Sequence, residues 1–317
     1  MRFTPDFFIA GAPKAGTDAL YYELDQHPQI YMSPLKEPCY FASEIRVEHF
    51  EPGLRERMKQ EADSVREFIR GPMTTKRFGG IVSEWDDYLR LFAQVKDEKA
   101  VGEGSVCYLW SRTAAAAIAA RLPKARIVIV LMDPAERAFA QYLKSVSDGT
   151  VSHSFSQHLD ACFRRTGEYL GVLHPFLEFG MYGQQVRRYM EAFPAAQLHI
   201  SLLEETQRDQ RGWFSGILEF LGLNLAFVPE GGRGHYHPNV PKFVRISQSL
   251  QARGLWKALG QCVPKSFQPA VKRLLYRQTE SITMHAEDRA RLVEYYGADI
   301  EELQRLLKKD LTHWLRV

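Results

Sequence analysis

The sequence predicts an α/β protein with a central parallel sheet flanked by helices. Apolar runs of strand length occupy residues 7–10, 125–131 and 197–203. These runs alternate with segments of helical pattern, and such alternation is typical of a parallel sheet covered by helices on both faces. The first run leads into the glycine-containing turn GAPKAGT at residues 11–17, and a helix follows. Since ligands bind where parallel strands end, we expect the 11–17 and 132–134 turns to line one crevice.

The helices between these strands carry their own signals. The alanine-rich segment 111–123 predicts a helix because alanine is the best helix former and Pro123 follows its end. The next helix has Asp133 as its expected N-cap, Pro134 as its first residue and Glu136 as the reciprocal capping-box partner. Further helices are expected at about 183–193, 213–221 and 298–315, the last being amphipathic and packed on the body.

The composition indicates one globular domain over residues 1–317, with 45% hydrophobic and 25% charged residues. A net charge of +3 is too small for a nucleic-acid-binding protein, and no apolar run is long enough for a membrane span. The first residues resemble a strand rather than a signal peptide. The four cysteines form no CxxC pair, so we expect no metal site and a reduced, cytoplasmic location. Residues 42–99 resemble a charged insertion, and residues 245–317 a helical C-terminal extension.

The 11–17 turn has the outline of a phosphate-binding loop with a displaced lysine. In the nucleoside-triphosphate loop GxxxxGK[ST] the lysine follows the second glycine. Here Thr17 follows Gly16, and Lys14 precedes that glycine by two residues. Main-chain N–H groups and the helix dipole attract a phosphate to such a turn, beside Lys14. From these residues alone, a plain turn with a solvated lysine is the alternative.

Several motifs, in family order, resemble the sulfotransferases that use 3′-phosphoadenosine 5′-phosphosulfate (PAPS). They are GAPKAGTDAL, SPLKEPCYF, VGEGSVCYLW, IVIVLMDPAERAFAQYL, GMYGQQVRRYMEAFP, LLEETQRD and FLGL. The resemblance covers residue 5 to about 240 and is greatest to bacterial and carbohydrate-type (heparan and chondroitin sulfotransferase-like) members. It implies the sulfotransferase fold, with a P-loop-like strand–loop–helix. It also implies transfer of a sulfuryl group from PAPS to an acceptor hydroxyl or amine, with 3′-phosphoadenosine 5′-phosphate (PAP) as product and no metal.

The resemblance assigns roles to matching positions. Lys14 would stabilise the charge that builds on the departing 5′-phosphate, and Glu37 would take the acceptor's proton. By itself, the Lys36–Glu37 pair would be two solvated loop charges. The expected donor-binding residues are Pro13, Lys14, Ala15, Gly16, Thr17, Asp18, Ala19, Met132, Arg137, Ala140, Tyr182 and Arg233. Tyr108 and Trp110 are candidates for the acceptor side, and Arg187 is a further candidate near the nucleotide.

The positions that should hold the 3′-phosphate depart from the family pattern. Members usually carry an arginine at the strand end and a serine eight residues later, where this chain has Met132 and Ala140. An arginine–phosphate bond is worth about 1.5–3 kcal/mol, so its loss should weaken donor binding unless another cationic side chain compensates. The candidates are Arg137, Arg233 and Lys242. For Arg137 the favoured alternative is a structural salt bridge.

Two other positions differ from the family. Asp18 stands where members carry threonine, serine or a basic residue, and we expect it to point sideways, since a carboxylate is favourable in a first helical turn. Gly104 replaces a lysine of some carbohydrate-type members, and Lys36 is the nearest substitute, so we include it among the catalytic residues. His235 and His237 are interpreted as loop histidines rather than metal ligands.

Two rival interpretations come from a different class of function. One is a family member with altered or lost donor use, motivated by Met132, Ala140 and Asp18. The other is a nucleotide-dependent kinase, which the sequence GTD at residues 16–18 and the lack of a magnesium-binding acidic strand end disfavour. Carbohydrate, lipid and secondary-metabolite acceptors are all compatible with the sequence, and the oligomeric state is left open.

Overall fold

The protein is built on a five-stranded parallel sheet with the order β2–β5–β1–β6–β7. A computed structural model describes residues 3–230, 240–241, 276–277 and 282–317. The strands are β1 (Phe7–Gly11), β2 (Ile30–Met32), β5 (Ala100–Gly104), β6 (Arg126–Leu131) and β7 (Leu198–Leu202). Every pairing in this sheet is parallel, which confirms the predicted α/β class.

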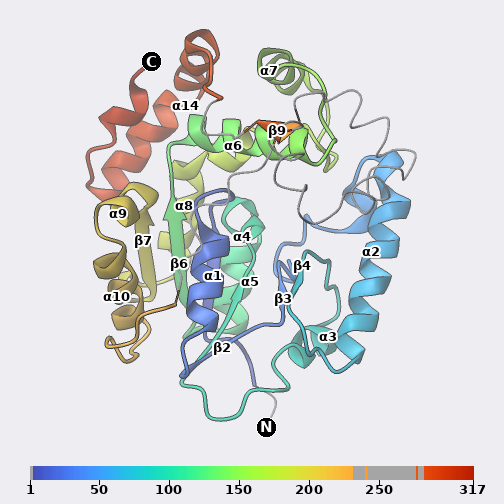
Figure 1. The fold of residues 1–317 in the computed structure, drawn as a ribbon, viewed down its shortest axis with the longest axis vertical. Coiled ribbons are helices and arrows are strands. Elements are labelled where there is room, and N and C mark those ends of the chain that lie inside the picture. The colour runs from blue at the N-terminus through green and yellow to red at the C-terminus, as the bar shows by residue number, and fades with distance from the viewer. Residues whose placement is uncertain (1–2, 231–239, 242–275, 278–281) are drawn as a thin grey trace, which may run out of the picture.

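Helices surround this sheet, as Figure 1 shows. The longer ones are α1 (Thr17–Asp25), α2 (Pro52–Arg70), α6 (Pro134–Ser147), α7 (Phe155–Arg164), α8 (Tyr182–Ala192), α10 (Gln210–Phe220) and α14 (Ala286–Leu307). The shorter ones are α3 (Trp85–Arg90), α4 (Cys107–Trp110), α5 (Ala114–Arg121) and α9 (Leu203–Arg208). Short 3₁₀ turns occupy Val47–His49, Glu178–Gly180, Ala195–Gln197 and Thr312–Leu315.

The expected charged insertion at 42–99 contains α2 and α3, which lie to one side of the central sheet, at the right in Figure 1. A second, two-stranded parallel sheet pairs β3 (Leu35–Lys36) with β4 (Arg77–Phe78). It connects this region to the segment that carries Glu37. In addition, β8 (Val240–Pro241) pairs with β9 (Tyr276–Arg277) in antiparallel fashion.

The start of α6 confirms two of the three predicted signals. The Asp133 side chain accepts hydrogen bonds from the N–H groups of Ala135 and Glu136, and Pro134 is the first helical residue. Glu136, the expected capping-box partner, extends its carboxylate to Arg289 of α14. A distant cation therefore competes for the side chain that local sequence assigned to the cap.

The C-terminal helix packs on the body, as its amphipathic pattern predicted, but it runs from Ala286 to Leu307 rather than over 298–315. A separate 3₁₀ turn occupies Thr312–Leu315. Leu292, Tyr296, Ile300 and Leu303 are buried on one face of α14 at helical spacing. This helix lies against α8 and α6. None of the helices in the described ranges is long and apolar enough to cross a membrane.

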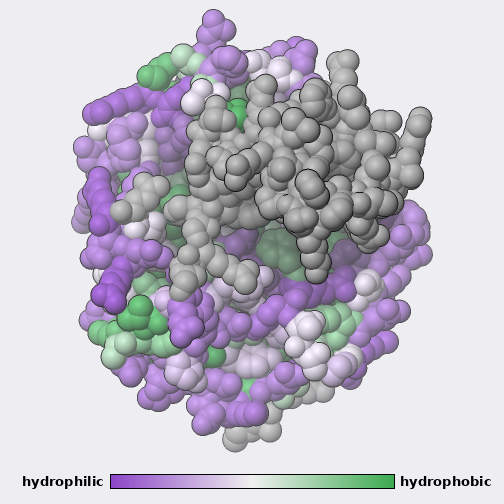
Figure 2. Space-filling model, in the orientation of Figure 1, coloured by the Kyte–Doolittle hydropathy of each residue, from purple (hydrophilic) through white to green (hydrophobic). Residues whose placement is uncertain are grey.

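The core centres on β1, whose five residues are all buried. Its neighbour β5 carries Gly102 where a larger residue would not fit, because a Cβ there would lie 2.1 Å from Cζ of Phe7. On the face shown in Figure 2, the described surface is mostly hydrophilic, with hydrophobic residues gathered in small patches. The polar groups that follow β1 and β5 form the candidate site.

Candidate functional site

The 11–17 turn is held tightly between the sheet and α4. Ala12 donates its N–H to the carbonyl of Val130 on β6 at 2.7 Å. A Cβ on Gly11 would lie 2.6 Å from Cβ of Leu109, so only glycine permits this close approach. Gly16 is the N-cap of α1 and has a left-handed φ of 80°, a conformation that favours glycine. The turn is therefore a rigid platform at the N-terminus of a helix.

Lys14 extends from this turn into solvent with a left-handed φ of 71°. Its side chain is exposed, yet enough protein surrounds the ammonium for partial desolvation to lower its pKa. The charge of Lys144, from α6, lowers the pKa further, while Asp18 and Asp148 act in the opposite direction. The charges of Lys14 and Lys144 thus act on each other at this end of the sheet, and two positive groups there favour an anion.

Lys144 is a further candidate for the site, and the motif analysis did not consider it. It lies one helical turn after Ala140, on the same face of α6, and forms an ion pair with Asp148. The sequence did contain a signal for Lys144, because it follows Ala140, the position of the family's serine, by four residues. The motif comparison considered only the position itself and the arginines nearby.

Lys36 lies between two carboxylates. Its Nζ is 2.6 Å from Oδ1 of Asp18 and 2.7 Å from Oε1 of Glu37, and the residue is 1% exposed. Burial disfavours the ammonium, but Glu37 and Asp18 outweigh this effect and raise its pKa above the usual value. Asp18 is therefore directed toward Lys36 in a structural ion pair. Two carboxylates neutralise the charge of Lys36. Lys36 is therefore not free to replace the lysine that some carbohydrate-type members carry at the position of Gly104.

The carboxylate of Glu37 is held at a fixed place. Its Oε2 accepts the N–H of Val106 at 2.8 Å, and its own N–H donates to the carbonyl of Gly104 at 2.8 Å. With the Lys36 contact, both carboxylate oxygens have partners. Glu37 also has a left-handed φ of 64°, which a non-glycine residue keeps only where its surroundings impose it. A carboxylate positioned in this way can accept a proton.

A second carboxyl group, Glu103, lies fully buried in the same neighbourhood. Tyr88 donates its hydroxyl to Oε1 at 3.1 Å, and Ser105 donates to Oε2 at 3.0 Å. Burial raises the pKa of Glu103 to about 7, despite these hydrogen bonds. Ser105 in turn accepts the N–H of Cys39 at 3.1 Å. Glu103 thus supports the segment that follows Glu37.

Two cysteines far apart in the sequence meet beside Glu37. The Sγ atoms of Cys39 and Cys107 are 3.2 Å apart. Within the described ranges, the side chains that could jointly ligate a metal ion are those of Glu37, Cys39 and Cys107, whose ligand atoms lie within 4.8 Å of one another. Their spacing in sequence gave no sign of this cluster, since only the fold brings the two cysteines together.

The expected ligands of the 3′-phosphate differ in burial and in their hydrogen-bond partners. Met132 and Ala140 are half-buried at the end of β6 and on α6. Arg137 is fully buried, and its guanidinium donates to the carbonyl of Phe176 at 2.6 Å and to Gln141. This arrangement corresponds to the structural alternative, with hydrogen bonds in place of the expected salt bridge, and it does not direct Arg137 toward solvent.

The two described candidates that remain on the nucleotide side both contact the C-terminal segment. Tyr182 is 1% exposed and packs near Trp314. Arg187 forms an ion pair with Glu302 of α14. The remaining candidates, Arg233, Lys242, His235 and His237, lie outside the described residues.

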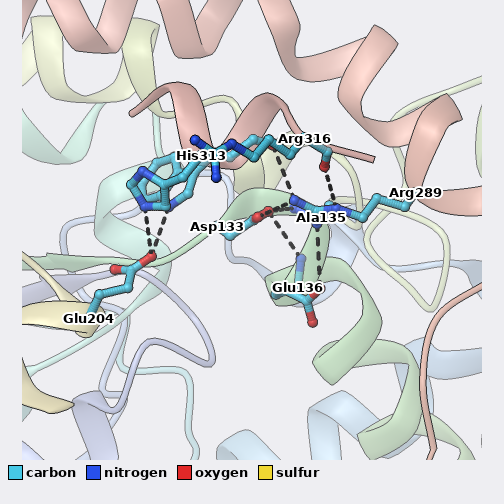
Figure 3. Close-up of polar contacts among 8 residues, drawn as sticks. Asp133, Ala135, Glu136, Glu204, Arg289, His313 and Arg316 are labelled. Atoms are coloured by element: carbon cyan, nitrogen blue, oxygen red, sulfur yellow. Dashed lines mark hydrogen bonds and ion pairs between the residues drawn. The ribbon is translucent and has the colours of Figure 1, made fainter. Parts of the chain in front are cut away.

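The turn after β6 is instead occupied by an arginine from the C-terminal helix (Figure 3). Arg289 lies 2.7 Å from Oδ2 of Asp133 and 3.4 Å from Oε1 of Glu136, and its Nε donates to the carbonyl of Arg316 at 2.7 Å. Nearby, Glu204 accepts the indole N–H of Trp314 at 2.7 Å. The C-terminal segment is thereby fastened to the turns after β6 and β7.

The two aromatic candidates of the acceptor side also differ. Tyr108 is fully buried in the core, so its side chain is not open to an acceptor. Trp110 is half-buried and lines a pocket of about 380 Å³. The other residues of this pocket are Ser43, Glu44, His49, Arg112, Glu168, Tyr169, Leu170 and His174. The pocket lies between the segment that follows Glu37, the end of α4 and residues 168–174.

Comparisons with known proteins agree with this fold and these motifs. The model of the sulfotransferase family matches residues 5–226. Bifunctional heparan sulfate N-deacetylase/N-sulfotransferase 3 of Homo sapiens is 25% identical over 329 residues, which cover 98% of this chain and 31% of that protein. Carbohydrate sulfotransferase 15 of Homo sapiens is 23% identical over 274 residues, which cover 70% and 44%. This chain thus spans less than half the length of either relative.

A solved structure aligns over the whole chain. The crystal structure of a sulfotransferase from Alicyclobacillus acidocaldarius has a TM-score of 0.69 and 27% identity, and the alignment covers 99% of this chain and 100% of that one. Both the family match and this alignment include β1, the 11–17 turn, Glu37 and the β6–α6 turn. The resemblance drawn from the motifs is confirmed, and the chain belongs to the sulfotransferase family.

Proposed function

We propose that this protein is an enzyme that transfers a sulfuryl group from PAPS to a hydroxyl or amine of a carbohydrate acceptor. One observation carries the proposal: the 2.6 Å ion pair between Asp18 and Lys36 joins the helix that follows the Lys14 turn to the segment of Glu37. An anion-binding turn and a positioned carboxylate are thus fastened together. The names of the relatives support a carbohydrate acceptor over a lipid or another small molecule.

In the proposed reaction, Glu37 accepts the proton of the acceptor group as its oxygen or nitrogen forms a bond to sulfur. The bond between sulfur and the 5′-phosphate oxygen breaks, and PAP leaves with the electron pair. Lys14 stabilises the charge that develops on that oxygen, because a positive group fixed beforehand needs no reorganisation during the reaction. The main-chain N–H groups of Gly16 and Thr17 bind the 5′-phosphate at the start of α1.

The 3′-phosphate needs a partner other than Met132 and Ala140. We assign this role to Lys144, because it lies one turn beyond Ala140 and its charge acts on Lys14. Its present partner, Asp148, is the neighbour that the phosphate would displace. If no residue replaces the missing ligands, the second candidate function applies, that of a family member with altered or lost donor use.

The pocket around Trp110 is the proposed place of the acceptor. A sugar ring packs well on an aromatic face, and its hydroxyl groups require polar neighbours within hydrogen-bonding distance. Trp110 and Tyr169 provide aromatic surface, while His49, Glu168 and Arg112 provide polar groups. Three of the lining residues, Glu44, Arg112 and Glu168, carry a charge, and such groups favour a hydroxyl-bearing sugar over a lipid.

The proposal is tested by measuring sulfuryl transfer from PAPS to a panel of desulfated and partly N-deacetylated glycans. We expect turnover by the wild-type protein and a loss of about 10²–10⁴-fold in kcat for Glu37→Gln. The control, Glu56→Gln, changes an exposed residue of α2 and should retain wild-type turnover. Absence of turnover with every acceptor, in a protein that still binds PAP, would favour the second candidate function.

A further inference from the structure

The two cysteines beside Glu37 are arranged for a covalent link. Cys39 follows Glu37 by two residues, and Cys107 is the first residue of α4. Their Sγ atoms are 3.2 Å apart, and the residues are 7% and 6% exposed. A disulfide bond is about 2.05 Å long, so an approach of about 1 Å would allow the two sulfurs to bond.

Both cysteines belong to the structure that holds the carboxylate of Glu37. The thiol of Cys39 donates to the carbonyl of Glu37 at 3.4 Å, and the residue has a left-handed φ of 55°. Val106, which precedes Cys107, donates its N–H to Oε2 of Glu37 at 2.8 Å. A movement of the two sulfurs therefore acts on Glu37 from both of the segments that position it.

We propose that Cys39 and Cys107 form a reversible disulfide that suppresses catalysis at Glu37. The disulfide stands on the thiol geometry alone, whereas its effect on catalysis rests on the proposed function. The oxidant is a hydroperoxide, and the reductant that reverses the step is a dithiol. The remaining cysteine in the described ranges, Cys162 of α7, takes no part.

The chemistry balances in two steps. The sulfur of Cys39 attacks a peroxide oxygen and the O–O bond breaks, which gives a sulfenic acid and one water. The sulfur of Cys107 then attacks that sulfenic sulfur, and the hydroxyl group leaves as a second water. Two thiols lose two electrons and two protons, and hydrogen peroxide is reduced to two waters.

The expected consequence is a change in kcat rather than in donor binding. A displacement of about 1 Å in a positioned catalytic group costs up to about 100-fold in rate. We expect the oxidised protein to show a kcat lower by about 10- to 100-fold. The bond does not include the Lys14 turn, so the fall in PAP affinity should be smaller than the fall in kcat.

The test treats the full-length protein with hydrogen peroxide in the presence of a chelator, blocks free thiols, and maps the peptides by non-reducing mass spectrometry. We expect a Cys39–Cys107 linkage in the wild type and in Cys162→Ser, with the fall in kcat reversed by dithiothreitol. The linkage should be absent from Cys107→Ser and from Cys39→Ser, and their kcat should resist peroxide. The wild-type map keeps the test valid if either variant folds poorly.

Three results would overturn the proposal. One is oxidation that leaves Cys39 and Cys107 unlinked, and another is a linked protein whose kcat is unchanged. The third is a loss of activity in the absence of chelator, with no disulfide formed by either cysteine and with activity restored when chelator is added. That result would identify a metal bound by Glu37, Cys39 and Cys107. Failure of the reduced wild type to turn over PAPS would instead contradict the proposed function, because the peptide map is read independently of activity.

Discussion

Replacement of Lys36 by methionine should destabilise the fold strongly. The ammonium lies 2.7 Å from Glu37 and 2.6 Å from Asp18 and is almost completely buried. At an effective dielectric constant of about 20, each attraction is about 6 kcal/mol before desolvation is subtracted. Removing one partner of a buried pair costs about 3–5 kcal/mol, because the other charge is left uncompensated. Asp18 is half-exposed and can be solvated, so most of this cost should come from Glu37.

The measurement is the free energy of unfolding from urea denaturation at pH 7. We expect Lys36→Met to lose about 3–5 kcal/mol, and the double variant Lys36→Met/Glu37→Gln to recover about half of that loss, since it removes the uncompensated charge. The control is Lys76→Met, whose ion pair with Asp25 has a similar length, 2.6 Å, but is partly exposed and should cost less than about 1 kcal/mol. A loss below about 1 kcal/mol for Lys36→Met, or no recovery in the double variant, would refute the reasoning.

Three further changes test other parts of the account. Lys144→Met should weaken PAP binding by about 10- to 150-fold in calorimetry and weaken AMP binding by a smaller factor. Burial raises the pKa of Glu103 in the folded state from 4.5 to about 7. The free energy of unfolding should therefore fall by up to about 3 kcal/mol as pH rises from 4.5 to about 7. In urea unfolding, Glu103→Gln should flatten this fall. Gly102→Ala should cost about 1–3 kcal/mol or more in thermal unfolding because its Cβ would overlap Phe7, whereas Gly297→Ala, in α14 with open space around it, should stabilise by about 0.5–1 kcal/mol.

Elements with a strong local signal were predicted correctly. The continuous β-branched run of β6 and the Asp133–Pro134 start of α6 depend on neighbours in sequence, and both are present in the structure. The short strands β2 and β3 carry no comparable pattern. Their strand conformation comes from pairing with β5 and β4, which are far away in the sequence.

The residues of the candidate site were found by motif, but their partners were not. Asp18 was expected to point sideways, and it pairs with Lys36 because α1 and β3 meet in the fold. Arg137 was a candidate to bind a phosphate, but it is fully buried and its guanidinium donates to the carbonyl of Phe176. Such pairings depend on tertiary contacts, which spacing along the chain does not encode.

The same limit applies to the cysteines. Cys39 and Cys107 have no motif spacing, and the wide separation argued against a metal or redox site. Their Sγ contact arises because the segment after β3 crosses the start of α4. Sequence rules for cysteine clusters detect ligands that are close along the chain, and this pair is close only in space.

Calorimetric titration with PAP, AMP and magnesium-bound ATP tests the central claim most directly. The account predicts that PAP binds to the wild-type protein more tightly than AMP or ATP, and that Lys14→Met lowers the PAP affinity by at least about tenfold, or 1.4 kcal/mol. Equal and weak binding of PAP and AMP would contradict recognition of the 3′-phosphate and favour a family member with altered donor use. Tighter binding of magnesium-bound ATP would contradict the PAPS assignment itself.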